Sequence, residues 1–294
     1  MEQRPEKYIN PLTDFGFKKL FGTEPNKDLL IDFLNQILPD QKIKDLTYTT
    51  NEQLGKLKVD RKAVFDLYCI GKDGERFIVE MQKAKQNYFK DRTVFYSSFP
   101  IQAQAQQGGD WDYKLKPVYS VGVLDFSFDD HKEEEELLHV VELKNQRCEV
   151  FYDKLKFVYI ELPKFTKEAQ ELETDFDRWL YVFTHLQKLQ DRPEQLQSRI
   201  FKKLFRAAEI AGFTKKEQEE YEESLKNYRD IKNVVDTARA EGVKIGEVKG
   251  EAKGEIKGAR RRNIEIAKQM KEDGEPIQKI QKYTGLSKEE IEKL

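Results

Sequence analysis

The chain has 294 residues and a formal net charge of -2, so its charge balance predicts no general attraction to nucleic acid and any basic surface must be local. Charged residues make up 36% and hydrophobic residues 38% of the chain, which predicts a real core together with long solvated helices. Two cysteines exclude a disulfide framework and no apolar run approaches the length of a membrane span, so we expect a cytoplasmic protein that makes no membrane contact.

The N-terminal segment predicts two helices and a strand. Thr13 or Asp14 can cap a first helix, which ends at Gly22. Apolar residues at helical spacing predict a second helix over 26–38, and 43–49 follows as a candidate strand. Asp14 is therefore open to two interpretations, as a helix N-cap or as an acid of a functional site.

A hairpin of two short strands, at 58–70 and 75–84, is the central feature of the sequence. The segment between them, 71–75, reads Gly-Lys-Asp-Gly-Glu and predicts a tight turn. If the loop has three residues, Gly74 takes the left-handed conformation and the strand pairing is symmetric about residue 73.

This register brings two acidic side chains together. Asp66 then lies directly opposite Glu80, and Gln82 lies on the same side of the sheet as Glu80. A two-residue turn would instead place Asp66 opposite Met81. We favour the first register because it clusters the polar groups. It also sends three apolar side chains together to the opposite face, namely Phe65, Leu67 and Cys69.

Helices and strands continue to alternate after the hairpin. A helix is expected over 86–107, with a kink or break at Pro100. The β-branched run at 118–126 is typical of a buried strand, and an acidic loop covers 129–136. The other expected elements are strands at 138–143 and 157–162 and helices at 176–190, 195–211 and 215–240.

Glycine recurs every four residues in a highly charged segment, 241–259. Each glycine costs a helix about 1 kcal/mol relative to alanine. Opposite charges here lie mostly two residues apart, which gives a helix little support. The segment is either a low-complexity linker or a weak oligomerisation helix in which small residues allow close contact. We favour the linker, and a homo-oligomer stays open.

The last segment, 260–294, has the outline of a small helix-turn-helix module. Helices are expected near 262–272 and 276–283 and after a Thr-Gly turn, where Ser287 and Glu290 form a capping box. The last helix is short and acidic, which does not suit the major groove of DNA. A packing or protein-contact module is therefore the interpretation that we favour.

The hairpin would place two carboxylates and an amide oxygen around one point, from Asp66, Glu80 and Gln82. Like charges in this arrangement repel each other, whereas hard divalent cations prefer such oxygen ligands. Mg²⁺ held in this way polarises phosphoryl oxygens and activates water, which is the chemistry of phosphodiester hydrolysis. Two acids facing solvent on an edge hairpin would show the same spacing, so the pattern alone leaves both readings open.

The same acids carry a family resemblance. Asp66 followed by Glu80-Met81-Gln82 resembles the D…(D/E)xK signature of the PD-(D/E)XK nuclease superfamily. Flanking motifs over about residues 8–190 are similar to those of the PD-(D/E)XK family transposases, also described as Rpn-type recombination-promoting nucleases. These motifs are PLTDFGFKKLFG, FIVEMQ, DRTVFYSS, KPVYSVGVLDF and ELPKF.

The resemblance assigns roles to individual residues. It implies that Asp66 and Glu80 bind a divalent metal ion such as Mg²⁺, and that Asp14 is a further acid of the catalytic group. Gln82 stands where the superfamily has lysine. It can hydrogen-bond an attacking water but supplies no charge.

The missing lysine leaves the positive charge of such a site unassigned. Lys83 is one position away and is expected to point to the other face of the sheet. Lys85 is a stand-in only if the strand continues that far. Arg92 and Gln104, with Lys85, are candidates for contacts with DNA.

The resemblance implies an α/β fold: a restriction-endonuclease-like core with a central mixed sheet flanked by helices, and a helical C-terminal extension. The function it implies is a Mg²⁺-dependent DNA endonuclease linked to recombination or mobile elements. Gln82 keeps an alternative open, a catalytically weak or inactive nuclease-fold protein that binds DNA or protein. The expected domains are a nuclease core over 1–165, a helical extension over 166–240, a Gly-periodic linker or helix over 241–259 and a helical module over 260–294.

Overall fold

The structure is a computed structural model that describes residues 5–49, 52–53, 63–105, 112–131 and 134–294. The chain forms two compact units, Met1–Lys232 and Asn233–Leu294. Among the described residues, no helix combines the length and the hydrophobicity that crossing a bilayer requires.

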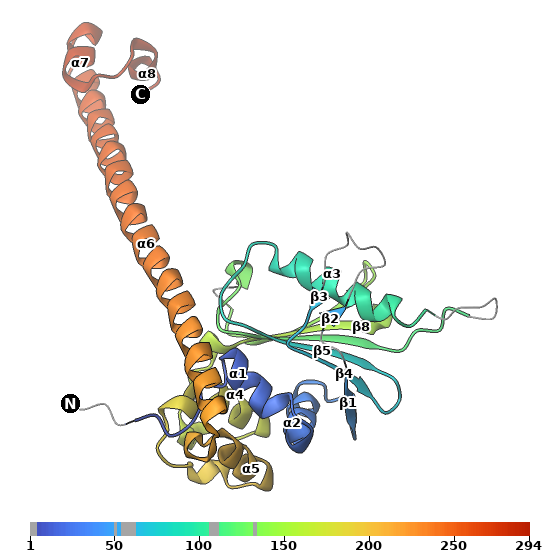
Figure 1. Cartoon of the computed structure of the whole chain (residues 1–294). Helices are drawn as coiled ribbons and strands as arrows, with labels where there is room; N and C mark the ends of the chain where they lie inside the picture. The colour runs from blue at the N-terminus through green and yellow to red at the C-terminus, as the bar shows by residue number, and fades with distance from the viewer. Residues whose placement is uncertain (1–4, 50–51, 54–62, 106–111, 132–133) are drawn as a thin grey trace. The chain divides into compact units, whose positions relative to one another are not determined.

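A mixed six-stranded sheet, counted over the described residues, is the framework of the first unit (Figure 1). Its strand order is β1-β4-β5-β6-β8-β7, in which β5, β6 and β8 run parallel and the other neighbours antiparallel. The bounds are β1 Leu46–Tyr48, β4 Leu67–Gly71, β5 Arg76–Gln82, β6 Val118–Leu124, β7 Leu138–Lys144 and β8 Val150–Glu161.

The predicted first strand of the hairpin, 58–70, differs from the structure. Its residues 58–62 lie outside the described part of the chain. The remainder divides into β3 (Ala63–Val64), which pairs with β2 (Glu52–Gln53), and β4. A bend at Asp66 separates β3 from β4.

The register of the hairpin is the one that the turn chemistry favours. Leu67 pairs with Val79 and Ile70 with Arg76, so the pairing is symmetric about residue 73. Within the turn, Gly74 has a φ of 92°. This left-handed conformation is the one that a three-residue loop requires and that glycine adopts without steric cost.

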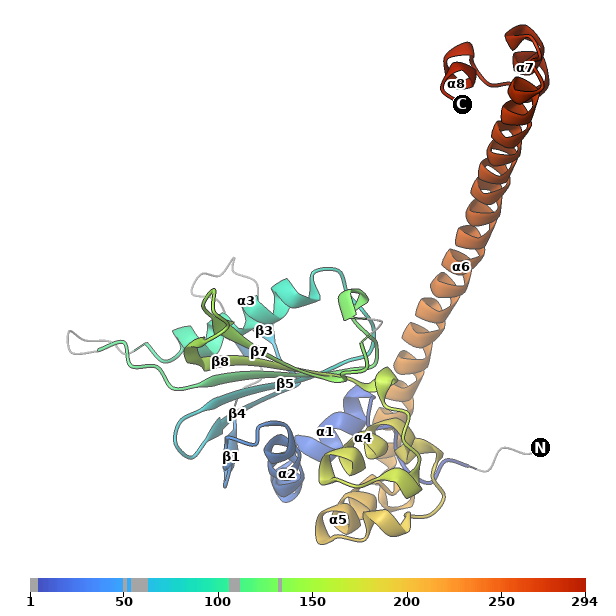
Figure 2. The ribbon, with the colours of Figure 1, turned by 180° about the vertical axis from the view of Figure 1, so that it is seen from behind.

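Helices cover both faces of the sheet (Figures 1 and 2). On one face, Tyr68 and Ile78 pack against α3 (Phe89–Gln102), which keeps Pro100 inside it. On the other face, strand residues such as Val79 share one core cluster with five helices of the described chain. These are α1 Asp14–Phe21, α2 Lys27–Ile37, α4 Asp175–His185, α5 Arg199–Ala208 and the start of α6 Lys215–Glu272. The predicted α/β fold with a central mixed sheet is thus confirmed.

The prediction for Phe65 was wrong. We expected it on the same face as Leu67 and Cys69, but it packs with Tyr68 and Ile78 beneath α3. The reason is the bend at the next residue, because strict alternation of side chains holds only within an unbroken strand.

The Gly-periodic segment 241–259 is helical, which its glycines and charge spacing did not favour. It lies inside α6, which runs without interruption over Lys215–Glu272 and contains the boundary between the two units. The residues between the glycines are four Lys, three Glu, two Val, two Ile and one Ala. Glu, Lys and Ala are strong helix formers, which offsets part of the glycine cost.

The second unit ends in two short helices, α7 (Ile277–Thr284) and α8 (Lys288–Glu292). The predicted capping box is confirmed, since Ser287 Oγ accepts from the backbone N–H of Glu290 and the Glu290 side chain accepts from that of Ser287. Its buried residues form a separate small core: Ala267, Ile280, Leu286 and Ile291. Short 3₁₀ helices occur at Glu24–Asn26, Asp129–His131, Leu162–Lys164, Ala169–Glu171, Leu186–Lys188, Glu194–Leu196 and Ile210–Gly212.

Candidate functional site

The two acids of the hairpin meet where β4 begins. Glu80 lies within β5, and extending the observed register by one residue puts Asp66 opposite it. Asp66 Oδ2 accepts a hydrogen bond of 2.7 Å from the backbone N–H of Met81. The Asp66 carboxylate thus takes the place of a backbone carbonyl in the ladder, which positions it between the two faces of the sheet.

Burial makes both carboxylates harder to ionise. It raises the pKa of Glu80 to about 8, and the nearby charge of Asp66 acts in the same direction. Burial also raises the pKa of Asp66, against the hydrogen bond from Met81, and the charge of Asp14 raises it further. Each shift reports a charge that has lost water without gaining full compensation from the protein.

The Glu80 carboxylate is only partly satisfied. Its side chain is 12% exposed, and Oε2 lies 3.5 Å from a terminal guanidinium nitrogen of Arg92. The other oxygen, Oε1, is buried and has no hydrogen-bond partner among the described residues. Buried carboxylate oxygens normally have partners, so an orphaned one calls for a ligand.

Gln82 is engaged by the protein at both ends of its amide. Oε1 accepts a 2.5 Å hydrogen bond from Arg92, and Nε2 donates a 3.0 Å bond to the carbonyl of Ala84. Arg92 also donates to Gln86 and lies over the rings of two aromatic residues of α3. Helix α3 therefore delivers a fixed guanidinium that links Gln82 to Glu80. These two rings belong to Phe89 and Tyr96.

Asp14 does not cap helix α1. The N-cap is Thr13, whose hydroxyl accepts from the backbone N–H of Gly16. The Asp14 carboxylate instead forms an ion pair of 2.9 Å with Lys18, one turn further on. The N-cap reading of Asp14 is therefore wrong, and its charge acts on Asp66.

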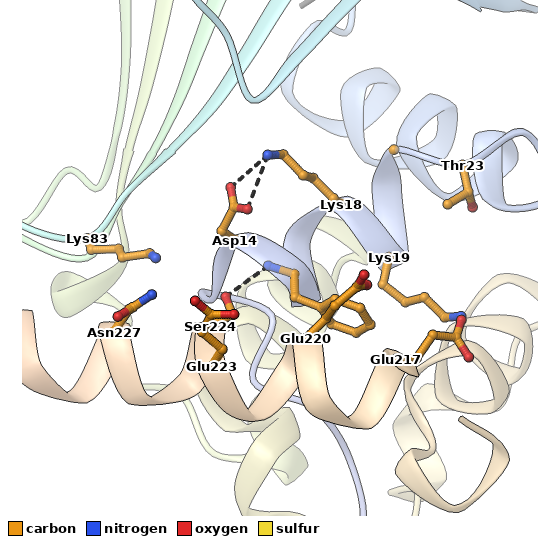
Figure 3. Close-up of a pocket in the computed structure, with 12 residues that line it drawn as sticks. Asp14, Lys18, Lys19, Thr23, Lys83, Glu217, Glu220, Glu223, Ser224 and Asn227 are labelled. Atoms are coloured by element: carbon orange, nitrogen blue, oxygen red, sulfur yellow. Dashed lines mark hydrogen bonds and ion pairs between the residues drawn. The ribbon is translucent and has the colours of Figure 1, made fainter. Parts of the chain in front are cut away.

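A cavity of about 590 Å³ lies beside this group (Figure 3). Lys83, the residue directly after β5, lines it together with Asp14 and Lys18. Burial lowers the pKa of Lys83, against the charges of Asp14 and Asp66. Its other lining residues are Phe15, Lys19, Gly22 and Thr23 from the α1 side and Glu217, Glu220, Glu223, Ser224 and Asn227 from α6.

Two of the candidate DNA contacts lie outside this group. Lys85 follows the end of β5 and pairs with Asp129, so it is not a stand-in for the missing lysine. Gln104 hydrogen-bonds both backbone groups of Lys116, at 2.7 Å and 3.2 Å, after the end of α3. Their contacts with DNA stay predictions. Arg92, the third candidate, is the one that the fold brings to the acids.

The residues present fit a divalent metal ion held by two side chains. Among the described residues, no group of three or more His, Cys, Asp or Glu side chains is arranged to hold a metal ion. Asp66 and Glu80 nevertheless supply carboxylate oxygens, and the buried Glu80 Oε1 has no other partner among those residues. Mg²⁺ is commonly held by one or two carboxylates together with waters and substrate phosphate.

The signals for these residues differ in strength. Asp66 and Glu80 can be identified from the hairpin pattern, because strand register is a local property. The sequence places Lys83 next to Gln82 but does not predict the cavity that it lines. Alternation does predict that Lys83 leaves the sheet on the face away from Glu80, but not that its charge still interacts with that of Asp66.

A family model describing PD-(D/E)XK nuclease family transposases matches residues 11–238. No curated protein and no solved structure shows a significant match to the chain. The family match includes the hairpin, Asp14, Arg92 and every lining residue of the cavity. With its mixed sheet, flanking helices and buried acid pair, this chain belongs to the PD-(D/E)XK nuclease family transposases.

Proposed function

We propose that this protein is a Mg²⁺-dependent DNA endonuclease that acts in the cytoplasm, in recombination or in the movement of mobile elements. The observation that supports this most directly is the buried pair Asp66 and Glu80, with an orphaned carboxylate oxygen, in a chain of a nuclease family. Burial of such a pair without a cation is destabilising, so its presence favours a role that needs a cation.

Each residue has a distinct task in this proposal. Asp66 and Glu80 would hold the metal ion, and Asp66 is oriented by its hydrogen bond to Met81. Bound Mg²⁺ supplies polarisation of a phosphoryl oxygen and activation of water. Arg92 fixes Glu80 from the side of α3, and Gln82 fixes Arg92. Gln82 is thus a positioning residue.

Plasmid cleavage by an Asp66→Asn variant tests the proposal. The amide keeps the size of the side chain and an oxygen that can accept from Met81, but removes a charged ligand. Without this ligand the transition state loses several kcal/mol of charge stabilisation. We therefore expect the Mg²⁺-dependent cleavage rate to fall on the order of 100-fold or more. Asp73→Asn, in the exposed turn of the same hairpin, is the matched control and keeps the wild-type rate.

Both variants are compared with the wild type by thermal unfolding, so that a loss of rate is not mistaken for a loss of fold. Cleavage by Asp66→Asn at the wild-type rate would remove Asp66 from the catalytic group.

A second candidate function is DNA binding by a nuclease fold without efficient cleavage. The engagement of Gln82 at both ends favours it, because the amide is not free to orient an attacking water. Wild-type protein that binds duplex DNA but leaves plasmid intact with Mg²⁺ or Mn²⁺ would select this function over cleavage.

A further inference from the structure

The position that usually carries the catalytic lysine supplies no charge in this chain. Gln82 occupies it, and both ends of its amide are hydrogen-bonded within the protein. Hydrolysis of a phosphodiester still builds negative charge on the phosphoryl oxygens, which a fixed cation stabilises. A cation of the protein close to the acids can take this part beside the metal ion.

Among the residues that the structure describes, three cations lie near the acid pair, and two of them are engaged. Arg92 bonds to Gln82 and Gln86 and pairs with Glu80. Lys18 pairs with Asp14. An ammonium or guanidinium already committed to a carboxylate has less charge to offer to a phosphate.

Lys83 is the third cation, and it is differently placed. It forms no hydrogen bond or ion pair with any of the described residues within 4.0 Å. Its side chain extends into the cavity of about 590 Å³, on the side of Asp14 and Asn227 (Figure 3). A half-buried ammonium without a direct partner that lines a cavity is available to a ligand.

The backbone fixes where this ammonium is. Gln82 is the last residue of β5, and its carbonyl accepts a 2.9 Å hydrogen bond from the backbone N–H of Asp125 after β6. Lys83 therefore leaves a rigid strand end, three residues after Glu80. Asp66, which lies between the two faces, connects the metal-binding acids to the face on which Lys83 lies.

We propose that Lys83 is a catalytic residue that contacts a non-bridging oxygen of the scissile phosphate and so supplies the charge that Gln82 lacks. This rests on the proposed nuclease function. In the reaction, the bond from water oxygen to phosphorus forms while the bond from phosphorus to the leaving sugar oxygen breaks. The water gives a proton to solvent and the leaving oxygen takes one from solvent. Lys83 keeps its proton throughout and acts by charge alone.

The test compares Lys83→Met with Lys83→Arg in Mg²⁺-dependent plasmid cleavage. Methionine keeps the length of the side chain but removes the charge, so the cleavage rate falls on the order of 100-fold, the typical loss for one charge-stabilising group. Arginine keeps the charge and retains a rate within about 10-fold of the wild type. Lys72→Met is the matched control, because it removes the same charge in the exposed turn of the hairpin, and we expect it to leave the cleavage rate unchanged.

A second readout does not depend on cleavage. Binding of a labelled DNA duplex is measured by fluorescence anisotropy without divalent metal, over a range of salt concentrations. Loss of one phosphate contact decreases the slope of log affinity against log salt by about 1 in Lys83→Met, and Lys72→Met leaves the slope unchanged. If Lys83→Met fails to fold, Lys83→Gln takes its place.

The outcomes separate the two proposals. Wild-type cleavage and an unchanged salt slope in Lys83→Met, with Asp66→Asn inactive, overturn the role of Lys83 and leave the nuclease function standing. A wild-type protein that cleaves no DNA with any divalent metal overturns both.

Discussion

Glu80 is a residue whose burial has a measurable cost. The free energy of unfolding depends on pH wherever a group binds its proton differently in the folded and unfolded states. The pKa of Glu80 is raised from 4.5 to about 8 in the folded protein, mainly by burial. Between these two values the folded protein holds a proton on this carboxyl that the unfolded chain has released. Stability is therefore highest below the unfolded pKa and decreases as pH rises through the folded pKa.

Glu80→Gln should abolish this dependence. In metal-free urea unfolding, the wild type loses stability relative to Glu80→Gln between about pH 4.5 and about pH 8, by up to about 1.4 kcal/mol for each pH unit in that range. Mg²⁺ added at the alkaline end restores stability to the wild type but not to the variant, because a ligand that binds only the folded state stabilises it. Asp73→Asn is the control and follows the wild type at every pH. Parallel curves for wild type and Glu80→Gln would contradict the burial argument.

For individual residues, the sequence predicts the positions of the acidic side chains of the candidate site better than those of the basic ones. Asp66 and Glu80 follow from a strand register that five turn residues specify. The positions of Lys83 and Arg92 near these acids depend on where a strand ends and on how a helix packs against it, which are tertiary properties. Phe65 shows the same limit, since one bend in the chain reverses the face that alternation predicts.

Among the elements, α6 departs furthest from local expectation. Gly242, Gly246, Gly250, Gly254 and Gly258 all lie within it. A Cβ added at any of them would meet no atom of the described residues within 4 Å, apart from the adjacent residues and backbone of its own helix. These glycines thus have the conformational cost of glycine in a helix without a packing reason among the described residues. Local propensity underestimated the length of this helix. The conformational cost of the glycines is spread over a helix of 58 residues, and both ends of that helix lie outside the glycine-containing segment.

Alanine at Gly246 and Gly250 should therefore stabilise the second unit. Each change adds about 0.5–1 kcal/mol, which thermal unfolding of the whole chain followed by circular dichroism at the helix band detects as a later transition. Gly285→Ala is a control that should lower stability instead. Gly285 ends α7 with a φ of 67°, and a residue with a side chain is strained in that conformation. A loss of stability in Gly246→Ala would indicate that these glycines contact a partner, as the oligomerisation reading of the segment requires.

For the whole molecule, the first turns of α6 are integral to the first unit. The backbone N–H of Asn10 donates to the Tyr221 hydroxyl at 2.9 Å, and that of Phe15 donates to Ser224 Oγ at 3.1 Å. Tyr228 donates to Asp125 at 2.7 Å. These bonds connect the start of α6 to the segments around Asp14 and the end of β6, so the segment that carries Asp14 is held by residues more than 200 positions away in the chain.

Two truncations test this dependence. A chain that ends at Lys232 keeps these bonds, and we expect it to fold with a melting temperature within a few degrees of the full chain and to keep Mg²⁺-dependent cleavage. A chain that ends at Phe213 loses all three, each worth about 1 kcal/mol, together with the buried rings of Tyr221 and Tyr228. It should unfold at a lower temperature and lose cleavage. Light scattering of the first truncation also tests assembly, because an unchanged oligomeric state excludes residues 233–294 as the assembly element. Equal stability of the two truncations would show that the start of α6 is dispensable for the first unit.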